Sequence, residues 1–463
     1  MAETRNDFSQ GDIKKSITRL AIPMIVAQLI NVLYNIVDRM YVGHIPGEGM
    51  LPLTGLGITF PIITIITAFT NLCGQGGAPL CSIERGAGNN EKAERIMGNA
   101  CTLLLFFCVI VTAASFIFKV PVLRAFGASD QTLPYADDYL TIYLCGNFFS
   151  MLGLGLNTFI SAQGFSKVSM LTVGLGAVVN IVLDPLFIYA FHMGVKGAAL
   201  ATIISQFISM VWVLRFLTSE KTILRLRLRH MKPDLPLCGR ILGLGMSNFV
   251  MSLTTSAVQI FSNTTLAQYG GDLYVGAMTV VTSVHEVALK PVQGFTSGAQ
   301  PVLSFNYGAH KYERAEQCIR YMTKVCLIMC FVITALVVAL PHFFVLVFNN
   351  KPELVEVSEK ALRIYFCVYT FMGLQMAGQS TFVSLGMSKQ AIFFSLLRKA
   401  VIVVPLTILL PRTAMGVWGV FWADPISCVT ACVACFVTML LTVVPRLRKM
   451  EALEHAEPDA ERF

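Results

Sequence analysis

The sequence predicts an all-α integral membrane protein, with twelve transmembrane helices in two six-helix bundles related by a pseudo-twofold axis along the membrane normal. Three observations predict this fold. The 463 residues are 55% hydrophobic and only 13% charged, with a mean hydropathy of +0.66, whereas a soluble domain carries about 25% charged residues. Apolar runs long enough to cross a bilayer recur along the chain. Three loop motifs also repeat at one offset, which indicates an internal duplication.

The apolar runs read as helices because they lack the period-2 alternation of a membrane β-barrel, and a helix satisfies every backbone group in lipid. Because the number of runs is even, both termini are expected on one side of the membrane. The predicted runs are 17–42, 55–80, 96–118, 139–163, 168–191, 197–217, 241–268, 275–303, 322–348, 362–385, 391–410 and 417–444.

The internal repeat has an offset of 222 residues. Residues 85–94 (RGAGNNEKAE) return as 307–316 (YGAHKYERAE), 164–167 (GFSK) as 386–389 (GMSK), and 193–197 (MGVKG) as 415–419 (MGVWG). Two copies of six helices share one topology, and transporters use such parallel halves to form a cleft whose rocking gives alternating access. A duplication without a transport function is the alternative.

Lysine and arginine residues predict the orientation. We count 25 of them in the amino-terminal tail, alternate loops and carboxyl-terminal tail, a set that includes those from Lys389 to Lys399, against six in the other loops. Positively charged loops are retained in the cytoplasm, so both termini should be cytoplasmic. The predicted organisation is an amino-terminal half (1–217), a basic cytoplasmic linker (218–240), a carboxyl-terminal half (241–446) and a cytoplasmic tail (447–463).

The net charge of +8 does not indicate a nucleic-acid partner, because the excess lies in short segments between apolar runs. Positive-inside retention explains the basic linker better than lipid or nucleic-acid binding does. The 13 cysteines and seven histidines are scattered, so no metal site or cofactor is predicted. No GxxxxGK[ST] loop occurs, and ATP is therefore not the encoded energy source.

Carboxylates at membrane depth are costly and are functional candidates by default. Asp184 lies inside the fifth run, with Asn180 one turn earlier on the same face, and Asn35 and Asp38 form a polar stripe on the first helix. Thr202 adds a hydroxyl on the sixth helix. Oxygens of this kind could hold sodium, and a desolvated carboxylate could hold a proton. The alternative is that these groups only bond helices together.

The carboxyl-terminal half does not repeat the Asn180–Asp184 pair. Its ionisable residues at membrane depth are Glu286 and Lys290, four apart in the eighth helix, and Asp424 in the twelfth, at the repeat position of Thr202. We expect these three residues, together with Asn35 of the first helix, to contact substrate or to form a secondary coupling site. Glu286 and Lys290 could instead be a self-neutralised ion pair.

Taken together, these motifs resemble the multidrug and toxic compound extrusion (MATE) family, in particular its MepA-like and DinF-like bacterial branch. The resemblance covers nearly the whole chain and implies an antiporter that expels organic, often cationic, compounds in exchange for H+ or Na+. It also implies that Asp38, Asn180, Asp184 and Thr202 bind the coupling cation. The matching segments are AIPM (21–24), DRMYVG (38–43), the Gly-Ala loops at Gly86 and Gly308, the Gly-x-Ser-Lys loops at Gly164 and Gly386, and Asn180 with Asp184-Pro185.

Several further expectations follow from the resemblance. The protein should be a monomer in the bacterial inner (plasma) membrane, with small organic molecules and the lipid bilayer as its partners. Some relatives carry acidic residues in helices seven and ten that this chain lacks, so the resemblance does not supply a second, carboxyl-terminal cation site. The alternatives are a flippase for lipids or lipid-linked oligosaccharides and, from another class, an integral membrane enzyme. The sequence offers that enzyme no nucleophile or metal cluster with suitable spacing.

Overall fold

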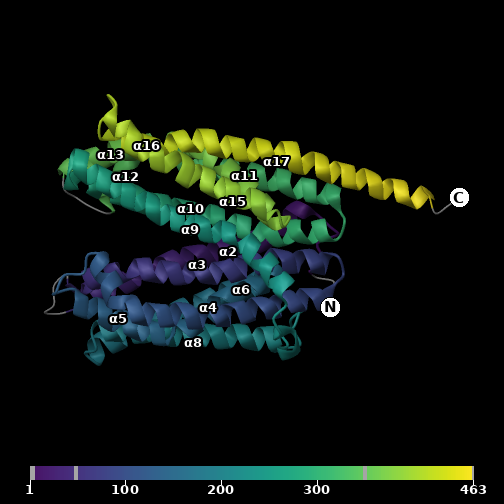
Figure 1. Ribbon diagram of the computed structural model, residues 1–463, viewed down its shortest axis with the longest axis horizontal. Helices are drawn as coiled ribbons and strands as arrows, with labels where there is room; N and C mark the ends of the chain where they lie inside the picture. The colour runs from purple at the N-terminus through teal and green to yellow at the C-terminus, as the bar shows by residue number, and fades with distance from the viewer. Residues whose placement is uncertain (1–5, 46–50, 348–351, 461–463) are drawn as a thin grey trace. The chain divides into compact units, whose positions relative to one another are not determined.

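A computed structural model describes residues 6–45, 51–347 and 352–460, and within these ranges all regular structure is helical (Figure 1). In chain order the first elements are α2 (Ile13–Gly43), α3 (Leu51–Gly86), α4 (Asn90–Ala125), α5 (Leu133–Cys145), α6 (Asn147–Ala162), α7 (Ser166–Pro185), η1 (Leu186–Ala190), α8 (Val195–Thr218) and η2 (Leu228–Met231). They are followed by α9 (Leu235–Gly270), α10 (Asp272–Gly308), α11 (Tyr312–Ala339), α12 (Pro341–Leu346), α13 (Pro352–Phe366), η3 (Tyr369–Phe371), α14 (Met372–Ser384), α15 (Ser388–Leu396), η4 (Leu397–Val403), α16 (Val404–Leu409), η5 (Leu410–Arg412) and α17 (Trp418–Ala460).

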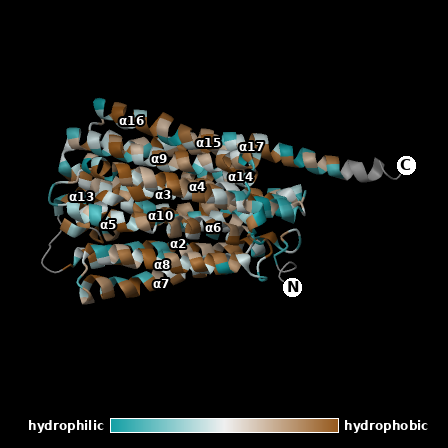
Figure 2. Ribbon diagram, turned by 60° about the horizontal axis from the view of Figure 1, so that its bottom comes forward, coloured by the Kyte–Doolittle hydropathy of each residue, from teal (hydrophilic) through white to brown (hydrophobic). Residues whose placement is uncertain are grey.

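All twelve predicted runs fall on helical segments, and the all-α membrane fold is confirmed. In the described part of the chain nine helices are long and apolar enough to cross a membrane, or ten when the bent pair α5–α6 counts as one span. The other two predicted spans are α10, whose polar residues lower its hydropathy, and α13–α14, which are too short singly. Figure 2 shows hydrophobic residues along the helices and more hydrophilic ones towards their ends.

Several predicted spans are interrupted. The fourth bends by 59° between α5 and α6, at Gly146. The fifth and eleventh contain the π-helical segments η1 and η4, which are turns often found at functional sites. The ninth predicted run ends at Phe348, outside the described residues; its described part forms α11 and α12. Residues 1 and 463, where the predicted amino-terminal half begins and the tail ends, also lie outside them.

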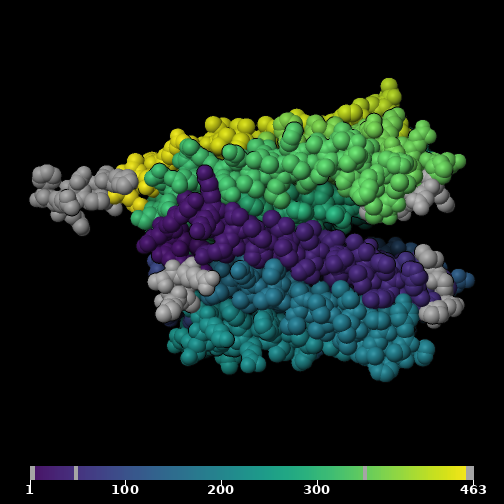
Figure 3. Space-filling model, turned by 180° about the vertical axis from the view of Figure 1, so that it is seen from behind, coloured from purple at the N-terminus to yellow at the C-terminus, as the bar shows by residue number. Residues whose placement is uncertain are grey.

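By internal packing the chain divides into two compact units. The first comprises Met1–Asp7 and Val26–Gly245, and the second comprises Phe8–Ile25 and Met246–Phe463. In the first unit α3 packs against α4 and α6, and α7 packs against α8. In the second unit α17 packs against α11, α13 and α14 (Figure 3, where the yellow helix lies along green segments). Each unit therefore has its own helical core.

The basic linker is docked on the first unit. The Glu94 carboxylate accepts a hydrogen bond from the Arg225 backbone N–H at 2.9 Å and pairs with Arg227 at 3.3 Å. Thr222 and the Leu224 N–H both donate to the buried Gln163 Oε1, each at 2.7 Å. The linker thus uses its charges and backbone groups locally, against side chains of its own unit.

Candidate functional site

The first unit holds a buried polar cluster between α7 and α8. Asn180 and Asp184 lie one turn apart on α7, both fully buried, and Asn180 Nδ2 donates to Asp184 Oδ1 at 3.3 Å. The same amide nitrogen lies 3.4 Å from Thr202 Oγ1 on α8. The hydroxyl of Thr202 donates to its own helix, to the carbonyl of Ala198 at 3.0 Å. The structure therefore brings three of the four predicted coupling residues into one hydrogen-bonded set.

The fourth residue, Asp38 on α2, borders this set. Its side chain is buried and interacts electrostatically with Asp184. The hydroxyls of Tyr34 and Tyr139 lie close enough to interact with both Asp38 and Thr202. The adjacent Arg39 interacts electrostatically with Asp38 without an ion pair within 4.0 Å, and its guanidinium carbon lies 4.3 Å from the centre of the Phe60 ring.

Three buried oxygen atoms of the cluster accept no hydrogen bond within the described part of the chain. Among the described residues no hydrogen-bond donor reaches Asp38 Oδ1, Asn180 Oδ1 or Asp184 Oδ2, although all three atoms are buried. Buried polar atoms are normally partnered, and a buried carboxylate is costly unless its charge is offset. Two carboxylates, an amide oxygen and a hydroxyl form a donor set that suits a hard cation or a proton.

The chain just after Asp184 is shaped by Pro185. Proline cannot donate a backbone hydrogen bond, and the helix changes to the π-helical segment η1 directly after it. From η1 the Tyr189 hydroxyl donates to the carbonyl of Tyr41 at 2.8 Å, which ties this segment to α2 three residues beyond Asp38. The Asn35 side chain bonds within its own helix, because its amide nitrogen donates to the Asn31 carbonyl at 2.6 Å.

The second unit contains a different buried cluster. Asp424 on α17 is paired with two cations of η4: Arg398 Nη2 lies 3.2 Å from Oδ2 and Lys399 Nζ lies 3.2 Å from Oδ1. All three side chains are buried. Arg398 and Lys399 were counted above as loop charges, and that assignment is wrong: both lie inside a helical segment. The adjacent pair of basic residues within an apolar run was the sequence signal for this site.

Aromatic rings enclose the second cluster. His285 on α10 packs edge-on against Tyr365 and Tyr369, with ring centroids 5.5 and 5.4 Å apart. His285 Nδ1 and Arg398 Nε are buried, and no described residue provides a hydrogen-bond partner for either atom. The cluster thus combines one carboxylate with two cationic side chains. Its charge is opposite in sign to that of the first cluster, in which the ionisable groups are carboxylates.

Glu286 and Lys290 do not form the ion pair considered above. Glu286 is exposed and Lys290 half-buried, and neither lies within 4.0 Å of an opposite charge among the described residues. One helical turn would permit the pair, but the two side chains do not use it. Both residues remain unpaired groups on α10.

A helical membrane fold with a duplicated unit and buried ionisable clusters defines the protein as a polytopic membrane transporter. The chain belongs to the MatE family, whose model matches residues 23–186 and 248–409. It is 24% identical to the multidrug export protein MepA of Staphylococcus haemolyticus, over 90% of this chain and 91% of that protein.

Solved structures share the fold. One is described as a MATE crystal structure in the bent conformation, with 25% identity, a TM-score of 0.89 and coverage of 96% of this chain and 98% of the other. Another is a MOP superfamily transporter from Pyrococcus furiosus, described by the reverse polarity of its binding pocket. It has 24% identity and a TM-score of 0.89, and the match covers 95% of this chain and 98% of that chain.

Proposed function

We propose that this protein is a cation-coupled multidrug efflux antiporter, which exports organic, cationic amphipathic compounds in exchange for H+ or Na+ by alternating access. Membership of the MatE family and the similarity to proteins named as multidrug exporters support the transport function. Lysine and arginine bias supports cytoplasmic termini in a bacterial inner membrane, and this bias survives when Arg398 and Lys399 are removed from the count.

The observation that carries the proposal is the set of buried oxygens without donors on Asp38, Asn180 and Asp184. A bound cation or proton would offset their negative charge while the site is closed to water. When the unit opens to one side, water can solvate the carboxylates and the ion can leave. Loading and release at Asp184 and Asp38 are then linked to which side of the membrane the site faces.

Coupling is assigned to the first unit alone. In the second unit Asp424 is already neutralised by the Arg398 and Lys399 side chains, at 3.2 Å each. These cations are part of the chain and cannot be exchanged with the medium. The second unit therefore holds its carboxylate with tethered cations and does not need a soluble one.

The test is transport by the purified protein in liposomes, with proton and sodium gradients imposed separately. One of the two gradients should drive export of a fluorescent organic cation. Asp184→Asn keeps the side-chain volume and cannot ionise, so this variant should insert normally and lose gradient-driven export. If Asp184→Asn, matched for abundance, exports at the parental rate, the assigned role of Asp184 is wrong.

The same vesicles separate export from lipid movement. Labelled lipid scrambling or flipping by the protein, with no gradient-driven dye export, would favour the flippase and contradict the proposal. Export of the dye without lipid movement supports it.

A further inference from the structure

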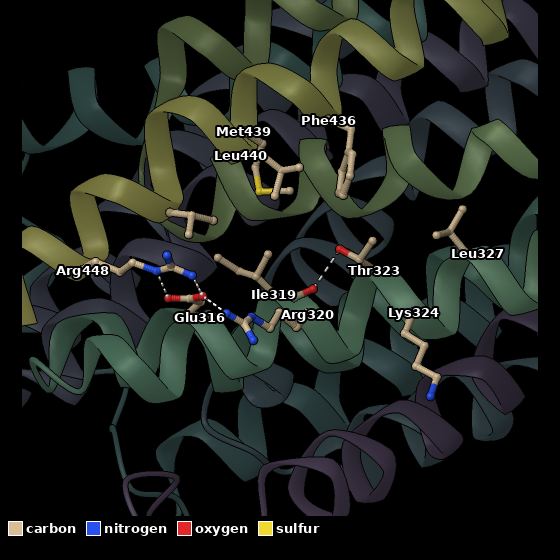
Figure 4. Close-up of a pocket in the computed structure, with 11 residues that line it drawn as sticks. Glu316, Ile319, Arg320, Thr323, Lys324, Leu327, Phe436, Met439, Leu440 and Arg448 are labelled. Carbon is tan, nitrogen blue, oxygen red and sulfur yellow. Dashed lines mark hydrogen bonds and ion pairs between the residues drawn. The ribbon is translucent and has the colours of Figure 1, made fainter.

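A groove lies between α11 and α17 in the second unit. It has a volume of about 400 Å³ and is formed by side chains one helical turn apart on each helix. Most of its wall is apolar, and the two helices run in opposite directions along it (Figure 4). The apolar lining residues are Ile319, Leu327, Phe436, Met439, Leu440 and Val444.

One end of the groove is charged. The Glu316 carboxylate accepts hydrogen bonds from Arg448 Nε at 3.0 Å and Nη2 at 2.7 Å, and a further one from Arg320. Figure 4 shows Glu316 held between the two guanidinium groups. Lys324, one turn beyond Arg320, is exposed, and no described residue pairs with it. Arg448 and Arg320 therefore accompany Glu316 at this end, and Lys324, further along α11, adds a third cation, which leaves an excess positive charge along the groove.

The groove's charged end coincides with the edge of the predicted membrane region. The predicted runs on these helices begin at Met322 and end at Val444. Lys324 lies eight residues after Glu316, roughly 12 Å along the helix. A lysine just inside the apolar region can extend its ammonium to the headgroup level. The apolar part of the groove then lies at the depth of the lipid acyl chains.

Nearby acidic residues do not cancel the excess charge. Glu451 accepts a hydrogen bond from the Glu313 backbone N–H at 3.0 Å, and Glu454 pairs with His310 at 2.9 Å. Both pairs lie beyond Glu316, on the side away from Lys324. The positive charge next to the apolar wall is therefore carried by Arg320 and Lys324.

We propose that this groove binds an anionic phospholipid. Its phosphate contacts the Lys324 ammonium and the Arg320 guanidinium, and one acyl chain lies along Leu327, Phe436 and Leu440. Charge complementarity selects an anionic headgroup, because basic pockets between transmembrane helices bind such headgroups. The apolar wall favours a lipid over a soluble anion, because at this depth an acyl chain fills the groove and makes van der Waals contacts along it.

The test measures lipid binding and is independent of transport. The full chain, purified in detergent, is titrated with phosphatidylglycerol or phosphatidylcholine, and native mass spectrometry counts the lipids retained. Phosphatidylglycerol should be retained in preference to phosphatidylcholine. Lys324→Gln should weaken phosphatidylglycerol binding about fivefold, which corresponds to about 1 kcal/mol per basic residue beside an anionic surface.

Two further variants separate charge from shape. Leu440→Trp fills the apolar part and should reduce retention of the lipid without changing charge. Lys167→Gln removes another exposed lysine, on α7, which has no ion pair among the described residues, and should leave retention unchanged. Equal binding of the two lipids, or parental binding by Lys324→Gln, would overturn the proposal. Monodisperse elution of each variant confirms that it is folded.

Discussion

Thr202 and Asp424 occupy the same position in the two repeats, 222 residues apart. The side chains around Thr202 include a carboxylate, whereas those that contact Asp424 are cations. The hydroxyl of Thr202 lies 3.4 Å from the amide nitrogen of Asn180, beside the Asp184 carboxylate, and among the described residues no lysine or arginine forms an ion pair with Asp184. Asp424 is bound by Arg398 and Lys399. The same repeat position therefore lies beside an unneutralised carboxylate in the first unit, and itself carries a neutralised carboxylate in the second.

The Arg398–Lys399–Asp424 cluster should respond unequally to loss of its members. Asp424→Asn leaves two buried cations without a carboxylate, and we expect it to lower the free energy of unfolding by about 3–5 kcal/mol. Lys399→Met keeps the Arg398–Asp424 pair, so its effect should be smaller. Thermal unfolding in detergent measures both. Equal destabilisation by the two variants would show that Lys399 matters as much as the carboxylate.

Substitutions of charged coupling residues should impair export more than substitutions of neutral ones. Asp38→Asn should impair gradient-driven export in the same direction as Asp184→Asn, because it removes the second carboxylate. Asn180→Ala removes an amide that donates to Asp184 at 3.3 Å but carries no charge. We expect Asn180→Ala to weaken Na+ binding roughly tenfold, because it removes the unpartnered Oδ1 as a ligand, and not to weaken proton binding, because the amide donates to the ionised carboxylate.

The measurement for this series is export rate as a function of coupling-ion concentration in proteoliposomes. Ser205→Ala, which removes a hydroxyl bonded to the Thr202 carbonyl of its own helix, is a matched control on α8. Loss of export by the control as large as that of Asn180→Ala would indicate a packing effect.

Glu286 should act separately from Lys290. Because the two side chains are not paired, replacing Glu286 by Gln should reduce export of organic cations while stability stays the same. Adding Lys290→Met should not restore it. Export assays with a cationic and a neutral substrate distinguish the cases, since only the cation should be affected. Recovery of export in the double variant would support mutual neutralisation instead.

The orientation can be tested with cysteine probes. Leu228 in the linker is 86% exposed, whereas Thr222 is buried against Gln163 and would be a poor probe position. In a background in which the exposed Cys145 and Cys367 are replaced by serine, an impermeant thiol reagent should label a cysteine at Asp130 in intact cells and not one at Leu228. Labelling at Leu228 from outside would reverse the topology.

Much of this molecule is set by local sequence. The twelve apolar runs could be located because a bilayer demands roughly 20 apolar residues per span and an internally hydrogen-bonded backbone, which are requirements on neighbouring residues. The Asn180–Asp184 pair could be found for the same reason, because four residues make about one helical turn. The repeat and the membership of a transporter family also follow from the chain itself.

Only the tertiary structure decided which charges meet. Arg398 and Lys399 lie 26 and 25 positions before Asp424, on another helix, and no periodicity in the sequence relates them. The absence of an ion pair between Glu286 and Lys290 was equally hidden, because spacing permits a contact and side-chain direction decides it. Helical periodicity fixes the face on which a residue lies, whereas helix packing fixes what that face contacts, and the neutralisation of a buried charge depends on the second.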